Sequence, residues 1–277
     1  MKLTDLLASE QSERIATGFQ FTEGPVWHPN GYLLFSDIPA NRIYKWLPDG
    51  KVEIFRQPSD NSNGLTLDQM GRLIACEHGD HRVSRTEPDG SVVSLASHYQ
   101  GRRLNSPNDV VVKSDGSIYF TDPPYGVQAE QRELDFQGVY RIVADGDLTL
   151  LTDDLERPNG LAFSPDERIL YINDTARRHI RAFKVLPDGT LADGRMFAEM
   201  QSPVGGGPDG MKLDSKGNLY VAGPGGTWLF DPAGRHLGTL ATPELPANLA
   251  FGDGDRRTLY ITARTSIYRV RTRLPGA

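Results

Sequence analysis

Six short motifs along the chain begin with a residue whose side chain ends in a carboxylate or a carboxamide. Each of these residues, here called openers, precedes a short apolar run that ends in a turn: Glu23, Asn63, Asn108, Asn159, Asp209 and Asn248. Carboxylate and amide oxygens are the ligands that hard divalent cations such as Ca²⁺ and Mg²⁺ take in proteins. An isolated Asn-Gly or Asp-Gly is also an ordinary turn signal. Each opener alone therefore allows either a binding role or a turn.

The spacing of the openers predicts the fold that positions them. Successive openers are 40, 45, 51, 50 and 39 residues apart, which is the interval of a four-stranded propeller blade. A second run rich in aromatic and β-branched residues follows each first strand, as in Ile118–Asp122 and Leu259–Ala263. No stretch has sustained helical periodicity. The sequence predicts an all-β, six-bladed β-propeller of four-stranded blades, forming a single domain over residues 1–277.

Turns and the N-terminal segment complete this prediction. Asp-Gly pairs at 49–50, 89–90, 145–146 and 188–189 separate third from fourth strands and favour hairpins, because these residues accept positive φ. The sixth repeat ends at Ile267–Val270 without a fourth strand, and Glu13–Thr17 has no blade of its own. We expect Glu13–Thr17 to close the ring as that strand, which removes an open sheet edge. Residues 1–11 are expected to form a short loose or helical lead-in.

Antiparallel strands should bring the openers together. A second strand returns to the face where the first one starts, so the openers should surround the mouth of the central channel. The second-strand ends should lie behind them: Asp37, Glu77, Asp122 and Asp174. Inward-facing carboxylates repel each other unless a cation lies among them. This arrangement favours one divalent cation, Ca²⁺ or Mg²⁺ before Mn²⁺ or Zn²⁺.

Further polar residues are expected on the same face. His78 ends a second strand there, and Arg103 precedes Asn108, although exposed solvated charge is an alternative for the arginine. The segment Pro123–Gln137 is long for a blade and is a candidate lid with Tyr125 in its wall, but its polar composition equally fits a solvent-exposed excursion. The candidate substrate contacts are Asn63, His78, Arg103, Asp122 and Tyr125.

Composition excludes several classes of protein. A formal charge of −6 disfavours nucleic acid and anionic membranes as partners, since both select clustered Lys and Arg. The single cysteine, Cys76, excludes an intramolecular disulfide, and no apolar stretch suits a signal peptide or a spanning helix. The absence of Gly-x-Ser-x-Gly disfavours a serine esterase. We expect a soluble, cytoplasmic protein.

The sequence resembles the family of senescence-marker protein, gluconolactonase and luciferin-regenerating enzyme, and is most similar to its bacterial gluconolactonase-type members. The motifs that carry the resemblance are Glu23-Gly24-Pro25-Val26-Trp27, Ser106-Pro107-Asn108-Asp109, Thr121-Asp122-Pro123-Pro124-Tyr125-Gly126, Arg157-Pro158-Asn159-Gly160 and Pro208-Asp209-Gly210. The likeness runs from about Thr17 to Val270. It implies that Glu23, Asn108, Asn159 and Asp209 hold a catalytic divalent cation, usually Ca²⁺, with Asp209 as the candidate general base.

The resemblance predicts a metal-dependent lactonase that opens a sugar lactone, a small-molecule substrate. Asn63 is then expected to hydrogen-bond water or substrate, and Glu23 is the alternative base because a metal-bound carboxylate such as Asp209 is a weak one. The same ligand set also serves organophosphate hydrolases, so a phosphotriesterase-like enzyme is one alternative. A non-catalytic ligand-binding propeller with a structural cation is another.

Overall fold

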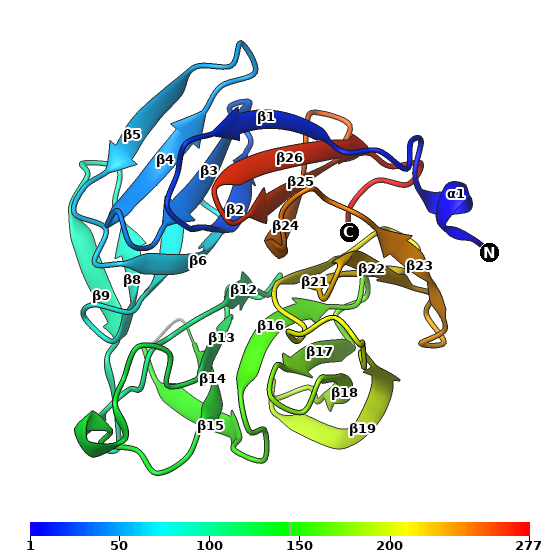
Figure 1. Ribbon diagram of the computed structural model, residues 1–277. Helices are drawn as coiled ribbons and strands as arrows, with labels where there is room; N and C mark the ends of the chain where they lie inside the picture. The colour runs from blue at the N-terminus through cyan, green and yellow to red at the C-terminus, as the bar shows by residue number, and fades with distance from the viewer. Residues whose placement is uncertain (144–145) are drawn as a thin grey trace.

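Strand-forming runs separated by tight turns fold into six four-stranded antiparallel sheets around a central axis (Figure 1). The structure is a computed structural model that describes residues 1–143 and 146–277. The predicted six-bladed propeller of four-stranded blades is therefore confirmed. Of the predicted turns, Ala144 and Asp145 lie outside the described residues.

Each blade runs from an inner strand beside the channel to an outer strand. Blade 1 contains β2 (Thr22–His28), β3 (Tyr32–Asp37), β4 (Arg42–Trp46) and β5 (Val52–Arg56). Blade 2 contains β6 (Ser62–Leu67), β7 (Leu73–Glu77), β8 (Arg82–Thr86) and β9 (Val92–Ala96). Blade 3 contains β12 (Val110–Val112), β13 (Ile118–Asp122), β14 (Gly138–Ile142) and β15 (Leu148–Thr152).

The second half of the ring repeats this order. Blade 4 contains β16 (Pro158–Phe163), β17 (Ile169–Asp174), β18 (His179–Val185) and β19 (Leu191–Glu199). Blade 5 contains β20 (Met211–Leu213), β21 (Leu219–Gly223), β22 (Gly226–Phe230) and β23 (His236–Leu240). Blade 6 contains β24 (Pro246–Gly252), β25 (Thr258–Ala263), β26 (Ser266–Arg271) and β1 (Glu13–Thr17). The remaining elements are α1 (Leu3–Leu6), η1 (Ala129–Gln131) and a small hairpin, β10 (His98–Tyr99) with β11 (Arg102–Arg103).

The N-terminal strand closes the ring as predicted. Strand β1 pairs antiparallel with β26, with Glu13 opposite Arg269 and Thr17 opposite Ser266. In Figure 1 the blue β1 lies along the red β26. The pairing gives blade 6 its fourth strand from the N-terminal segment, which closes the ring.

The hairpin between β4 and β5 shows how the recurring Asp-Gly turn works. Gly50 has φ 92° and donates its N–H to Leu47 O at 2.8 Å, while Leu47 N–H reaches Lys51 O at 2.9 Å. Asp49 Oδ1 accepts the N–H of Lys51 at 2.9 Å. The glycine takes the left-handed position that such a hairpin requires.

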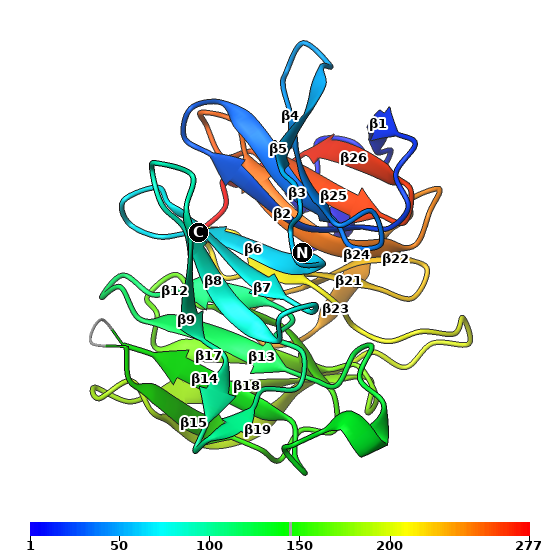
Figure 2. The same ribbon diagram turned by 90° about the vertical axis from the view of Figure 1, so that its left-hand side faces the viewer.

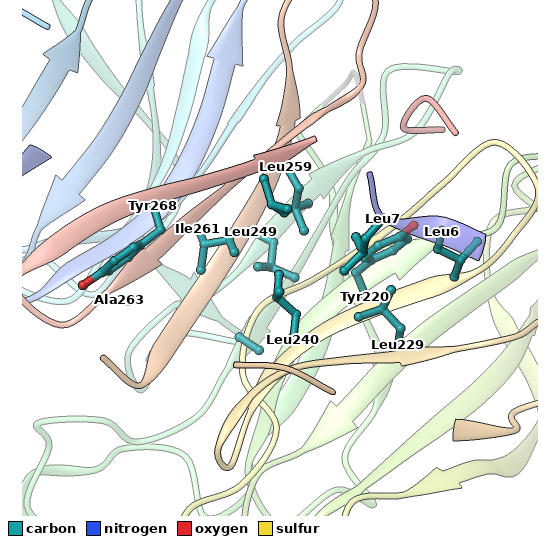
Figure 3. Close-up of a cluster of buried hydrophobic side chains, with 12 residues drawn as sticks. Leu6, Leu7, Tyr220, Leu229, Leu240, Leu249, Leu259, Ile261, Ala263 and Tyr268 are labelled. Carbon is teal, nitrogen blue, oxygen red and sulfur yellow. The ribbon is translucent and has the colours of Figure 1, made fainter. Parts of the chain in front are cut away.

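The hydrophobic core lies between neighbouring blades. Second strands such as β7, β13 and β25 are buried along their whole length, because blades pack on both of their faces, whereas the outer strands β5 and β9 are mostly exposed. Figure 3 shows one cluster between blades 5 and 6, where Leu6 and Leu7 pack beside Tyr220. Helix α1 thus covers the apolar edge of this junction. Within the described residues no helix is long and apolar enough to cross a membrane.

The loops that lead into the inner strands and the loops that follow the second strands lie on one side of the disc, because neighbouring strands are antiparallel. Figure 2 shows the loop that carries η1 and the yellow segment before β20 projecting toward the same side. The first segment is the loop 123–137, and the second contains the opener Asp209. This side of the disc is therefore the face where the openers were expected.

Candidate functional site at the channel mouth

Irregular backbone at the start of the inner strands directs the openers inward. Pairing between the first and second strands shifts register from Glu23 to Val26 in blade 1, from Ser62 to Leu65 in blade 2 and from Pro158 to Leu161 in blade 4. Such bulges re-aim side chains that regular pleating would direct elsewhere. Asn108 and Asp209 lie just before β12 and β20, where regular pairing has not yet begun.

Glycines after the openers allow the blades to approach each other. Gly24 has φ +48°, and a Cβ there would lie 2.0 Å from the carbonyl oxygen of Asn63 in blade 2. A Cβ on Gly160 would lie 2.3 Å from the carbonyl oxygen of Asp209 in blade 5. Only glycine fits at these two contacts, and each one sets the distance between neighbouring openers.

Three opener side chains from consecutive blades form a chain of hydrogen bonds. Asn63 Nδ2 donates to Asn108 Oδ1 at 2.6 Å, and Asn108 Nδ2 donates to Asn159 Oδ1 at 2.6 Å. Asn159 Nδ2 then donates to Tyr125 Oη at 3.2 Å and to Thr175 Oγ1 at 3.1 Å. All three asparagines are buried. Their amide oxygens each keep a second lone pair, so they can still act as cation ligands.

In blade 6 the opener position is one residue earlier than the sequence suggested. Gly64 N–H donates to the carbonyl oxygen of Asn108, and Gly210 N–H makes the equivalent bond to Ala247. Asn248 instead matches Asp109, since the side-chain Oδ1 of each accepts the N–H of its own successor, at 2.8 and 3.0 Å. Asn248 was therefore wrongly predicted as an opener, because the register shift between Pro246 and Asn248 displaces it one residue further into the channel.

Three carboxylates meet among these amides, and we call Glu23, Asp109 and Asp209 the inner carboxylates. Burial and the charges of Asp209 and Asp109 raise the pKa of Glu23 well above its ordinary value. Burial and the charge of Asp109 raise the pKa of Asp209 to about 7. Glu23 Oε2 accepts two uncharged donors, Gly24 N–H at 2.6 Å and Asn248 Nδ2 at 3.0 Å.

The inner carboxylates and the opener amides fit a hard divalent cation. Asp109 is 2% exposed, and its Oδ2 has no hydrogen-bond partner within the described residues. Buried like charges with an open oxygen are unfavourable without a compensating positive charge. The donors are oxygen atoms only, which suits Ca²⁺ or Mg²⁺. Glu23, Asn108, Asn159 and Asp209 could hold such an ion.

A polar cavity of about 360 Å³ lies beside this site. It is lined by Asn61, His78, Arg103, Tyr125 and Gln131, among others. Burial lowers the pKa of His78 to about 4, so the ring is neutral at pH 7, and its Nε2 lies 3.2 Å from Asn63 Nδ2. Arg103 donates to Gln131 O at 3.1 Å. The structure thus brings His78, Arg103 and Tyr125 to one cavity, with Asn63 as its link to the other openers.

The two ends of the long loop of blade 3 contact the rest of the protein. Leu134 is buried in the cluster between blades 2 and 3, and Asn105 Nδ2 donates to Phe136 O at 2.9 Å. Tyr125, near the start of the loop, contacts Asn159. Residues 128–133 are all exposed. Tyr125 therefore contributes to the wall of the site, whereas the middle of the loop is a solvent-exposed excursion.

Asp122 is not brought to the cavity. It is fully buried, its Oδ2 accepts Asn105 N–H at 2.8 Å, and its Oδ1 accepts Ser106 N–H at 2.7 Å. Asp37 and Asp174 bind the segments before β2 and β16 in the same way. We call Asp37, Asp122 and Asp174 the strand-end carboxylates. Their oxygens hold the chain that leads into each inner strand, so the expected substrate contact of Asp122 is not supported.

A further acidic group lies at the end of blade 2 and is neutralised by arginines. Asp60, Glu77 and Asp80 place carboxylate oxygens close together. Arg82 pairs with all three, and Arg56 also pairs with Glu77. This group therefore differs from the inner carboxylates, which form no ion pair within the described residues; Lys212 acts on Asp109 electrostatically.

Comparison with known proteins gives a consistent assignment. Residues 21–265 match the model of the SMP-30/Gluconolactonase/LRE-like region. A gluconolactonase of Zymomonas mobilis subsp. mobilis is 37% identical, with 95% of this chain and 82% of that protein covered. A pentonolactonase, XacC, of Haloferax volcanii is 28% identical, with 90% and 83% covered. The structure of the gluconolactonase XC5397 from Xanthomonas campestris superposes with a TM-score of 0.89 at 37% identity, covering 98% of this chain and 92% of that one. The chain belongs to the SMP-30/gluconolactonase/LRE-like family.

Proposed function

We propose that this protein is a divalent-cation-dependent lactonase that opens a sugar lactone at the mouth of the central channel. The observation that carries the proposal is the convergence of opener carboxylates and amides from five blades beside a polar cavity. In this proposal Glu23, Asn108, Asn159 and Asp209 hold the cation, with Ca²⁺ preferred. Membership of a family whose similar members are named lactonases supports the reaction.

The reaction is hydrolysis of a cyclic ester. A bound cation would supply Lewis-acid polarisation of the lactone carbonyl. Water adds to the carbonyl carbon and gives up a proton, the ring C–O bond breaks, and the released oxygen takes a proton to become a hydroxyl. The product is an open-chain hydroxy acid.

Asp209 is proposed to accept the proton from water. It remains partly exposed at the mouth, whereas Glu23 is 3% exposed and one of its oxygens already accepts two hydrogen bonds. Water can therefore reach Asp209 more readily than Glu23. The base role rests on this difference in access.

The cavity beside the openers is proposed to hold the remainder of the sugar. Asn61, His78, Arg103 and Gln131 offer both donors and acceptors, which match the hydroxyl groups of a polyol. Asn63 lies between His78 and Asn108 and is suited to orient the substrate or its attacking water.

Proton release during lactone opening tests the proposal. The purified protein would be stripped with a chelator, dialysed, and assayed on γ- and δ-aldonolactones with Ca²⁺, Mg²⁺, Mn²⁺ or Zn²⁺ restored separately. Spontaneous hydrolysis is subtracted with an enzyme-free blank. We expect turnover that disappears on stripping and returns with at least one cation.

Two other outcomes would replace this function. Turnover of a phosphotriester such as paraoxon, with no lactone opened, would identify the phosphotriesterase-like alternative. Binding of a cation with neither substrate turned over would favour a non-catalytic propeller. Full lactonase activity in the stripped protein would refute the dependence on a cation.

A further inference from the structure

The residue after each opener forms a second ring, one step further along the inner strands. Its members are Gly24, Gly64, Asp109, Gly160, Gly210 and Asn248. Four of them are glycine, and the two side chains fit against glycines of the preceding blade. A Cβ on Gly64 would lie 2.7 Å from Asp109 Oδ1, and one on Gly210 would lie 2.0 Å from Asn248 Oδ1. Asp109 and Asn248 thus occupy space that the preceding blades leave open.

Asn248 and Asp109 differ in how many of their polar side-chain atoms form hydrogen bonds. Asn248 Oδ1 accepts Leu249 N–H at 2.8 Å, and its Nδ2 donates to Glu23 at 3.0 Å. Asp109 Oδ1 accepts Val110 N–H at 3.0 Å, but its Oδ2 has no partner within the described residues. Packing alone would be served equally well by asparagine at position 109. The carboxylate therefore needs another explanation.

The surrounding charges make this carboxylate unfavourable in the protein without a cation. Asp109 lies close enough to Glu23 and Asp209 to act on both of them electrostatically. Lys212, on β20, is a positive side chain that acts on Asp109, and its ammonium group donates to Met211 O at 3.0 Å. A buried negative charge without a close partner destabilises the folded state. The same charge attracts a cation strongly, because the interior screens it poorly.

We propose that Asp109 is a positioning residue that acts through its charge: it strengthens cation binding by the openers and, in return, destabilises the cation-free protein. This inference rests on the proposed function, because it assumes the cation held by Glu23, Asn108, Asn159 and Asp209. Lys212 acts in the opposite direction and limits the net negative charge of the site. Removing the charge of Asp109 should therefore weaken cation binding, and removing the charge of Lys212 should strengthen it.

The test compares binding and stability in Asp109→Asn and the parent. Calorimetric titration of the stripped proteins with Ca²⁺ and Mg²⁺ should show affinity about 10- to 100-fold weaker in the variant, the range found for changes in groups around metal ligands. The melting temperature in chelator should rise, because one of three like charges is gone. The increase in melting temperature on adding saturating cation should become smaller.

Two further variants separate charge from packing. Asp122→Asn changes a buried carboxylate of the same blade that already accepts two backbone N–H groups. It should lower the melting temperature equally with and without cation and leave affinity unchanged. Lys212→Gln removes the opposing charge and should strengthen cation binding. This second variant keeps the test valid if Asp109→Asn does not fold.

The outcomes distinguish this inference from the proposed function. A parent that binds no divalent cation would overturn both. A parent that binds one, with unchanged affinity in Asp109→Asn, would overturn the role of Asp109 alone. Equal losses of stability with and without cation in Asp109→Asn would show a packing role, and unchanged affinity in Lys212→Gln would refute the charge effect.

Discussion

The inner carboxylates and the strand-end carboxylates are similar in depth but opposite in environment. Asp37, Asp122 and Asp174 are at most 1% exposed, and each accepts backbone N–H groups with both oxygens. Glu23 and Asp109 are 3% and 2% exposed, yet each lies within the electrostatic influence of other carboxylates, and one oxygen of Asp109 has no partner among the described residues. Burial of a charge therefore does not identify a functional residue. Within the described residues, what sets Asp109 apart from the strand-end carboxylates is a buried oxygen without a hydrogen-bond partner.

The largest expected effect is on catalysis, in Asp209→Asn. The carboxamide keeps one oxygen toward the cation but cannot accept a proton, so lactone opening should fall about 10²- to 10⁴-fold. Rates should be measured by proton release at saturating Ca²⁺ or Mg²⁺, which restores cation occupancy. Asn63→Ala, in the same ring of openers, should retain the cation and mainly raise KM. Parent-like turnover in cation-saturated Asp209→Asn would show that another group is the base.

The strand-end carboxylates should behave as purely structural groups, and Asp174→Asn tests this. Asp174 accepts backbone N–H from Glu156, Arg157, Ala176 and Arg177. Replacing the charge should lower the free energy of unfolding by about 2–3 kcal/mol, the contribution of hydrogen bonds to an ionised group. Urea denaturation should give the same loss with and without cation. A loss confined to the cation-bound protein would place Asp174 with the inner carboxylates.

On the cavity side, two adjacent arginines provide a matched pair. Arg103 lines the cavity, whereas Arg102 does not and lies 3.9 Å from Asp135 with a largely exposed side chain. Arg103→Gln should raise KM for a polyhydroxylated lactone about fivefold, equivalent to about 1 kcal/mol, with little change in kcat. Arg102→Gln should leave both constants within about 1.5-fold, since exposed ion pairs contribute little. Equal effects in the two variants would indicate general electrostatics instead of contact.

The smallest effect is expected for an exposed carboxylate, Glu13 on the closing strand. Its oxygens pair with Arg269 at 2.8 and 3.2 Å, and hydrogen bonding to that arginine lowers the pKa of Glu13. Glu13→Gln should reduce stability by less than about 1 kcal/mol, as for other exposed ion pairs. A lowered folded-state pKa means that this contribution is present above the ordinary pKa of glutamate and is lost as pH falls through the lowered one. Thermal melts of parent and variant should therefore converge in acid.

Much of the fold could be predicted because every repeat contains the same pattern of strand-forming runs and turns. Strand-forming runs, Asp-Gly turns and a missing fourth strand specified six blades and β1 at Glu13–Thr17, where it was found. The opener of blade 6 was predicted one residue too late. The sequence has a polar residue at Asn248, but the residue at the opener position in the structure is Ala247. Residue type alone cannot reveal a register shift in the backbone.

The site was predicted less completely than the fold. The hydrogen-bonded chain of Asn63, Asn108 and Asn159 agrees with the expected ring, but Asp122 was assigned to substrate because its backbone partners are not visible in the sequence. Asp109 was missed, although a signal existed: it is aspartate at a repeat position where four blades carry glycine. A departure from the protein's own repeat was more informative than the repeat itself.

Closure of the ring by β1 also has a consequence for biosynthesis. The partner of Glu13–Thr17 is Ser266–Arg271, about 250 residues later in the chain. A nascent chain leaving the ribosome must carry the first of these segments unpaired until the second has emerged, so blade 6 is completed only after the other five have been translated. Truncation between Asp253 and Ser266 would leave an open horseshoe with two exposed sheet edges. The last blade to be translated therefore decides whether the chain becomes a ring or an aggregation-prone fragment.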